Sequence, residues 1–411
     1  MPQMNFTQFL LEIADALRTE NGPKLAGLLK PVEEHGKSLV KEFRNPTKQS
    51  LSMYEGSMES PWDEIAIQYV LVVNHCAKRR AIEAFKEECQ LVSLFFRYFT
   101  QNSGWTLPAL FSILRDLRDL AFDADLEARH KGQGDTANME EAARIISKAF
   151  SNCITDRSSP YAESRRWGIY YVVGLVLKSY FRVKRISLSK NIVRAIDATP
   201  DIPPLSAYPR SHQVTYRYYL GMLNFLSEDF SKAEQELTLA FYNCHIGAHA
   251  NQVRILTYLI PLRVLRGHLP SRELLDRFPA LDDLYSPFIA AIRKGDIRAY
   301  DETLDRFERR LAELNLWLTM ERARELCIRG LFRRVWTASD KATRIPVSMF
   351  HTALHIAGLD VSIEEAECMV ANMIYRGYMR GYISHEKQMV VLANTNVFPR
   401  LADRPNPYAL V

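Results

Sequence analysis

Apolar residues recur along most of this chain at spacings of three and four, the period of an amphipathic α-helix. The first such stripe includes Phe9 and Ile13, with polar residues between its members. Helices are predicted over residues 4–18, 62–150, 163–198 and 212–316. Prolines interrupt them at 31–61 and at 200–209, because proline removes a backbone donor and disrupts a helix interior. We therefore predict an all-α chain, with strands only near its end.

The end of the chain shows a different pattern. Ser362 and Glu365 have the spacing of a capping box, and Gly377 is suited to end the helix that they begin. The apolar face of this helix is formed by Ala366, Met369, Val370, Met373 and Ile374. Two β-rich runs follow, 378–384 and 389–392, joined by a polar turn. With the helices before it, this pattern predicts a winged helix.

The middle of the chain carries a repeat signal. Small and apolar residues near the offsets of a tetratricopeptide (TPR) hairpin are Leu220, Gly221, Ala233, Leu237 and Ala240. We expect all of them except the glycine to lie in the core. A second hairpin is predicted over 288–304, turning at 294–296. The fold class is therefore an all-α, TPR-like helical-repeat solenoid that ends in a winged-helix subdomain.

Four regions are predicted from this pattern. They are N-terminal helical repeats (1–211), a TPR-like part (212–318), the winged helix (319–400) and a C-terminal tail (401–411). The length of 411 residues and an apolar share of 47% allow for a large core, and the net charge of +5 is only mildly basic. The six cysteines show no metal-ligand or redox spacing, so we expect reduced, packed thiols. We expect neither a secretory signal nor a membrane span.

The sequence lacks the common motifs of enzyme active sites. It contains no phosphate-binding loop, dinucleotide fingerprint, zinc-protease motif or nucleophile elbow. His351 and His355 are four apart on one predicted helix, and Cys244, His245 and His249 gather in a predicted turn. Neither set has the further ligands that a metal site needs. We expect no enzymatic activity, no cofactor and no metal.

Five segments carry a resemblance to a known family. They are residues 167–168, 193–197, 214–221, 258–262 with 267–270, and 381–385. In these segments the chain resembles the PCI-domain family that comprises the Thp-type subunit of the nuclear mRNA-export (TREX-type) complex and a paralogue first linked to the signalosome. The resemblance runs from about Phe6 to Leu401, nearly the whole chain.

The resemblance implies a non-enzymatic nuclear subunit. Such proteins pair through their PCI regions with a Sac-type scaffold and hold a small acidic Sem/Dss-type protein. Their joined winged helices present a basic surface that binds nucleic acid. The motifs do not separate the export subunit, which works at nuclear pores, from its paralogue, which is tied to transcription and splicing. The alternative is a purely structural PCI subunit of a proteasome-lid, signalosome or translation-initiation type complex, without nucleic-acid binding.

One set of basic residues is a candidate site for the acidic partner. No Asp or Glu occurs between Arg165 and Arg194, although positive and negative residues nearly balance over the chain, 53 against 48. The stretch is either a solvated helix face or a docking face for an acidic peptide. The candidates, from this stretch and a later one, are Arg182, Lys184, Arg185, Arg254, Arg263 and Arg266.

A second set is a candidate nucleic-acid site. It consists of Arg329, Arg333, Arg334, Arg376, Arg380 and Lys387. Tyr375, Tyr378 and Tyr382 lie among them and could stack on bases, although Tyr378 is more simply placed under the wing. Carboxylates at Glu364, Glu365 and Glu367 begin the recognition helix, where they disfavour the reading of base edges. We therefore expect salt-sensitive, largely non-specific binding of RNA or double-stranded DNA.

Overall fold

The computed structural model describes residues 4–132, 136–404 and 408, and its described part consists mainly of α-helices, as predicted. The chain divides into two compact units, Met1–Tyr219 and Leu220–Val411. The division falls within helix α11 (Arg210–Leu226), whereas the sequence pattern suggested a boundary at 211. Among the described residues, no helix has the length and apolarity needed to cross a membrane.

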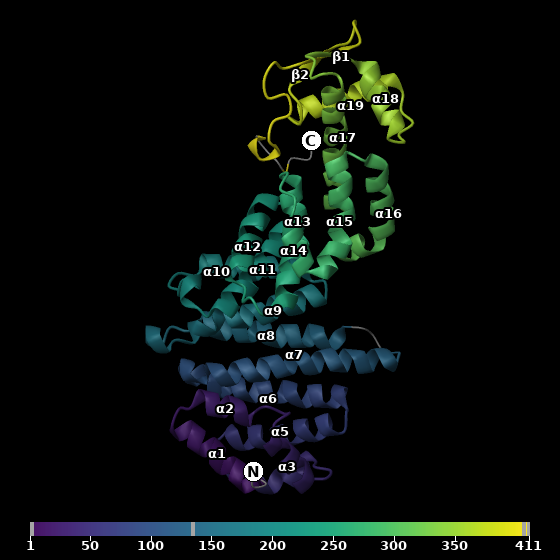
Figure 1. The fold of residues 1–411 in the computed structure, drawn as a ribbon. Helices are drawn as coiled ribbons and strands as arrows, with labels where there is room; N and C mark the ends of the chain where they lie inside the picture. The colour runs from purple at the N-terminus through teal and green to yellow at the C-terminus, as the bar shows by residue number, and fades with distance from the viewer. Residues whose placement is uncertain (1–3, 133–135, 405–407, 409–411) are drawn as a thin grey trace. The chain divides into compact units, whose positions relative to one another are not determined.

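The first unit is a stack of helices. In chain order they are α1 (Phe6–Arg18), α2 (Gly22–Leu28), α3 (Glu34–Glu42), α4 (Lys48–Leu51), α5 (Trp62–Ala77), α6 (Ala81–Gln101), α7 (Leu107–His130), α8 (Ala137–Ile154), α9 (Ile169–Arg182) and α10 (Ile186–Ala198). Helices α5 to α8 lie in successive layers, each packed on the next (Figure 1). Phe9 and Ile13 of the predicted stripe are fully buried. The periodicity of the sequence therefore identified the core-facing side of α1.

The segment between α8 and α9 folds around a buried ion pair. Asp156 accepts hydrogen bonds from the backbone N–H of Arg165 (2.8 Å) and from the Ser164 hydroxyl (3.0 Å), and its other oxygen lies 3.2 Å from the Arg165 guanidinium. Arg165 also donates to the carbonyl of Phe99 on α6 (2.9 Å). Arg165 therefore belongs to the interior, and the acid-free stretch proposed as a docking face does not begin there.

The second unit begins with helical hairpins. After α11 come α12 (Phe230–Asn243), α13 (His249–Leu265), α14 (Arg272–Arg277), α15 (Pro279–Lys294), α16 (Ile297–Glu313) and α17 (Trp317–Ala338). The predicted turn at 294–296 is confirmed, since Gly295 ends α15 with a left-handed backbone (φ 62°).

The predicted core positions of the first hairpin are confirmed with one exception. Ala233, Leu237 and Ala240 on α12 are fully buried, but Leu220 on α11 is only partly buried. The reason is that the neighbouring Gly221 faces α12 instead: a Cβ atom there would lie 2.8 Å from Cγ of Leu237. The hairpin therefore crosses closely at a glycine, as TPR-like packing requires.

A winged helix follows α17. It contains β1 (Arg344–Pro346), α18 (Val347–Ile356), α19 (Ile363–Tyr375), β2 (Gly381–Ser384) and β3 (Met389–Leu392), with an antiparallel sheet in the order β1-β3-β2. The Ser362–Glu365 capping box is present, and Gly377 follows α19 with φ 73°. The prediction missed β1, because three residues that end in a proline carry no recognisable alternation.

The segment after β3 returns to the helical hairpins. Arg404 lies over the ring of Tyr378, 3.9 Å from its centroid, and the Tyr408 hydroxyl donates a hydrogen bond to Glu234 on α12. Leu401 packs on Gly267, where an added Cβ would approach its side chain to 2.7 Å. The sequence pattern set this segment apart as a tail, but its described residues join the winged helix to the hairpins.

Candidate partner and nucleic-acid interface

The sheet of the winged helix has two edges of different character. β1 carries the exposed, charged Arg344 and ends in Pro346, which has no N–H to offer a neighbouring strand. β2 consists of Gly381, Tyr382, Ile383 and Ser384, without charge or proline. Charges and prolines are the usual protection of an edge strand, so only β1 is protected. Within the described part of the chain, β2 has a strand partner on one side only.

The predicted cations near this edge divide into paired and free ones. Arg376, at the end of α19, lies 3.3 Å from the carboxylate of Glu325 on α17. Burial raises the pKa of Glu325, while the charges of Arg376 and two other arginines lower it in part. Arg380 and Lys387 are exposed, and neither forms an ion pair with another described residue. The free positive charge of the wing therefore rests on these two residues.

The three tyrosines of the winged helix separate in the same way. The side chains of Tyr375 on α19 and Tyr382 on β2 are 76% and 63% exposed. Tyr378 is buried beneath Arg404, as the simpler interpretation of the sequence held. Two aromatic faces therefore remain available to bases or to a protein partner.

The acidic start of α19 is partly neutralised by the wing. His385 in the wing turn lies 2.8 Å from the carboxylate of Glu367, and Gln388 donates to the same carboxylate (3.3 Å). The hydrogen bond that the His385 ring donates to the Glu367 carboxylate, followed by the charge of that carboxylate, raises the pKa of His385 above its ordinary value. Glu364 and Glu365 remain exposed, so the geometry still disfavours base reading by the start of α19.

Helix α17 holds the remaining predicted nucleic-acid residues. Arg329 is turned inward, where it donates to the carbonyls of Pro399 (2.9 Å) and Tyr378 (3.3 Å). It therefore fixes the segment after β3 and has little freedom to contact a ligand. Arg333 and Arg334, one turn further along, are exposed, and neither forms an ion pair in the described structure.

The predicted acidic-partner residues fall in both units. In the first, Arg182 lies over the Phe122 ring (4.7 Å to its centroid), Arg185 lies 3.6 Å from Glu140, and Lys184 is exposed. In the second, Arg266 and Arg263 lie 2.7 Å and 3.7 Å from the carboxylate of Glu234, whereas Arg254 is exposed and donates to Asn251. Glu234 thus neutralises part of the later cluster. The assignment of these six residues to an acidic partner stays a prediction.

Sequence reasoning missed the acids that neutralise predicted cations. Glu325 lies on α17, whereas Arg376 follows α19, and Glu234 lies on α12, whereas Arg266 follows α13. The members of each pair are therefore far apart in the sequence, and no local pattern pairs them. The protected and unprotected edges of the sheet were also missed because β1 was not recognised. The only signal for the unprotected edge that the sequence offers is the composition of β2, an uncharged strand near the end of the chain.

The comparisons with known proteins agree with this architecture. The PCI-domain profile matches residues 304–394, from within α16 to just past β3. The chain is 38% identical to the protein CSN12 homolog of Schizosaccharomyces pombe over 360 residues, which cover 84% of this chain and 85% of that protein. The chain belongs to the PCI-domain family.

Two further relatives cover similar or greater lengths. The protein CSN12 homolog of Mycosarcoma maydis is 38% identical over 86% of this chain and 87% of its own length. PCI domain-containing protein 2 of Xenopus laevis is 29% identical over 98% of this chain and 99% of its own length. The resemblance to the PCI family is confirmed. None of the three names refers to an mRNA-export subunit.

Proposed function

We propose that this PCI protein is a non-catalytic subunit of a multisubunit complex and that it pairs with another PCI-domain protein through strand β2. The observation that carries the proposal is the unprotected edge: β2 is uncharged, free of proline and partnered on one side only in the described structure. An edge of this kind accepts a further strand, whose backbone hydrogen bonds supply affinity. The exposed ring of Tyr382 offers apolar area beside it.

Replacing Tyr382 with lysine is expected to weaken this pairing by about tenfold or more, because a charge on an edge strand opposes addition of another strand. The measurement is the affinity for the co-purified PCI partner, by biolayer interferometry with the full-length chain. Tyr242→Lys is the matched control, since Tyr242 is 73% exposed on α12, outside the winged helix. Equal binding by the two variants would place the pairing surface elsewhere.

Nucleic-acid binding by the paired winged helices is a second candidate function. The observation in its favour is that one winged helix carries both the free charges of Arg380 and Lys387 and the exposed rings of Tyr375 and Tyr382. Cations that meet phosphates release condensed counterions, and exposed aromatic rings stack on unpaired bases. Such a surface binds single strands with little sequence preference.

Changing Arg380 and Lys387 together to glutamate is expected to lower RNA affinity and to reduce the salt slope by about 1–2. Arg376 is left unchanged, because a glutamate there would face the partly buried Glu325 and would destabilise the winged helix. The measurement is fluorescence anisotropy with single-stranded RNA across a salt series, with the partner present. The control changes Arg306 and Arg309, exposed on α16, to glutamate. If the salt dependence of RNA affinity is unchanged in the Arg380, Lys387 variant, the wing does not bind nucleic acid and the purely structural function remains.

The finer identity of the complex is also a proposal. The relatives' names favour the structural alternative and the paralogue first linked to the signalosome over the mRNA-export subunit. A Sac-type scaffold and a small acidic Sem/Dss-type protein are the partners that the resemblance suggests, in the nucleus. Purification of the tagged chain from nuclear extract, with identification of stoichiometric partners, tests the scaffold partner, the acidic partner and the nuclear location.

A further inference from the structure

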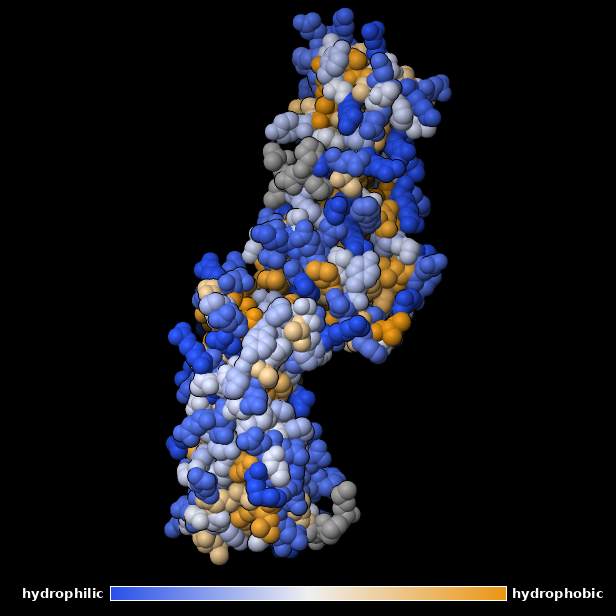
Figure 2. All heavy atoms as spheres, turned by 90° about the vertical axis from the view of Figure 1, so that its left-hand side faces the viewer, coloured by the Kyte–Doolittle hydropathy of each residue, from blue (hydrophilic) through white to orange (hydrophobic). Residues whose placement is uncertain are grey.

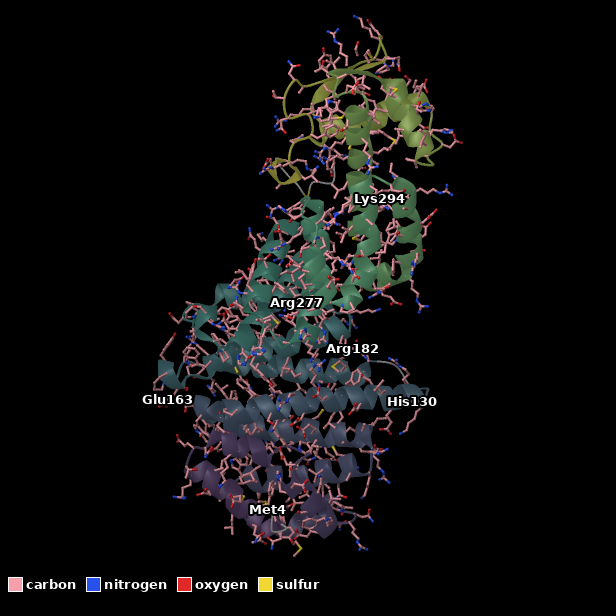
Figure 3. The ribbon with its side chains drawn as sticks, in the orientation of Figure 1. Met4, His130, Glu163, Arg182, Arg277 and Lys294 are labelled. Atoms are coloured by element: carbon pink, nitrogen blue, oxygen red, sulfur yellow. The ribbon has the colours of Figure 1, made fainter. Side chains whose placement is uncertain are left out.

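A pocket of about 420 Å³ lies in the second unit and is lined by arginines. Arg329, Arg333 and Arg334 enter it from α17, and Arg293 enters it from the last turn of α15. Leu401, from the segment after β3, forms part of its wall. Figure 3 labels Lys294, the neighbour of Arg293, at the end of α15.

The residues of α17 that line the pocket lie on one face of the helix. Leu326, Arg329, Arg333 and Thr337 follow one another at intervals of three and four, and Arg334 flanks them. A glycine at position 330 leaves room between these side chains. It also allows the end of α15 to approach closely, since a Cβ there would lie 3.2 Å from Cα of Gly295. The cavity is therefore a consequence of how the two helices cross.

The charge of this pocket is not balanced from within. No Asp or Glu lines it, and Arg293, Arg333 and Arg334 form no ion pair with any residue that the structure describes. Burial, then the like charges of Arg333 and Arg404, lowers the pKa of Arg329 to about 10. Hydrophilic residues cover much of the winged-helix end of the molecule in the view of Figure 2, at its top. The three free guanidinium groups, with Arg329 held inward beside them, repel one another unless an anion joins them.

We propose that this pocket binds a compact polyphosphate group. Guanidinium groups offer paired N–H donors that match phosphate oxygens, so several arginines favour phosphate over a single carboxylate. The volume is within the range of sites for small molecules. No aromatic side chain lines the pocket to stack on a base, and no carboxylate lines it to receive a ribose hydroxyl. The recognised group is therefore the phosphate chain, whether free or at the end of a nucleotide.

The phosphate pocket is separate from the wing and does not depend on the proposed pairing. Its free cations, Arg293, Arg333 and Arg334, lie on α15 and α17, whereas those of the wing, Arg380 and Lys387, lie beside β2. The sequence grouped Arg333 and Arg334 with the wing, because spacing along a helix does not show which hollow its side chains enter. Binding at the two places is expected to respond to different variants.

The test is calorimetric titration of the full-length chain with tripolyphosphate, and separately with ATP. We expect one saturable site for tripolyphosphate and at least about tenfold weaker binding in Arg293→Gln, Arg333→Gln and Arg334→Gln, each of which loses a charged hydrogen-bond donor. Arg344→Gln, which removes another exposed arginine, on β1 and outside the pocket, is the matched control and should bind as the parent does. Comparable affinity for ATP would assign the site to a nucleotide's phosphates; weaker ATP binding would assign it to free polyphosphate.

Three results would overturn the proposal. They are the absence of saturable tripolyphosphate binding, equal weakening by Arg344→Gln, and competition of tripolyphosphate with single-stranded RNA for the pocket arginines. The last would show that these arginines contact a nucleic-acid backbone instead. Thermal melting of each variant confirms that it is folded, and all of the changed arginines are exposed. The Arg380, Lys387 double variant should keep its tripolyphosphate affinity, so failure of the wing hypothesis and failure of this one are distinguishable.

Discussion

Replacing Asp156 with alanine is expected to destabilise the first unit by about 3–5 kcal/mol, because removal of one partner of a buried ion pair leaves the other charge uncompensated. The side chain of Asp156 is fully buried, and that of Arg165 is 8% exposed. The carboxylate receives hydrogen bonds from the backbone and hydroxyl groups of its own loop, so alanine also leaves those donors without an acceptor. This loss is larger than that expected for any exposed ion pair of the unit.

The same network makes the first unit sensitive to acid. Burial alone would raise the pKa of Asp156, but the backbone N–H of Arg165, the Ser164 hydroxyl and the guanidinium charge outweigh it and hold the pKa well below its ordinary value. A carboxyl with a depressed pKa in the folded state contributes stability above its unfolded pKa of about 3.9 and loses it as the pH falls further. The parent chain should therefore lose stability from about pH 5 downward.

Urea denaturation, with hydrogen exchange of residues 99–168 to locate the effect, measures both results. Asp156→Asn keeps the shape of the side chain but cannot titrate, so its smaller stability should change less with pH between about 5 and 3. Glu141→Ala is the control, because it breaks an exposed ion pair with Arg144 on α8. A loss no larger in Asp156→Ala than in Glu141→Ala would contradict the structural role assigned to the buried pair.

Local rules predicted the elements whose stability is decided locally. The Ser362–Glu365 capping box and the turn at Gly377 depend on residues a few positions apart, so the sequence shows them directly. Helical periodicity located the buried side of α1 and of α12 for the same reason. The strand β1 was missed because its pairing with β3, about 45 residues later, and not its own composition, makes it a strand.

The candidate site was less predictable, because the availability of a charge depends on the tertiary structure. Arg165, Arg329 and Arg376 look like surface cations in the sequence, yet the first two donate to backbone carbonyls and the third meets Glu325. Conversely, no local pattern marks Arg293 in the sequence, but the crossing of α15 and α17 brings it to the same pocket as Arg333. Counting charges along a chain thus finds where basic residues gather, but not which of them remain unpaired.

Replacing Gly295 with valine is expected to destabilise the second unit by about 2–5 kcal/mol. Part of the cost comes from the left-handed backbone (φ 62°), which a β-branched residue strongly disfavours. The rest comes from the crossing with α17, since a Cβ atom would lie 2.6 Å from the backbone nitrogen of Leu331. Backbone cannot rotate away as a flexible side chain can, so the two helices must move apart.

Gly358→Val separates these two contributions. Gly358 has φ 89°, but an added Cβ would meet only the side chain of Arg298, at 3.4 Å. This variant therefore incurs the backbone cost alone, and its urea midpoint should lie between those of the parent and of Gly295→Val. Because the same crossing forms the phosphate pocket, Gly295→Val should also weaken tripolyphosphate binding, which Gly358→Val should leave unchanged. If the two variants were equally stable and bound equally well, the close approach of α15 and α17 would not be what holds the pocket arginines together.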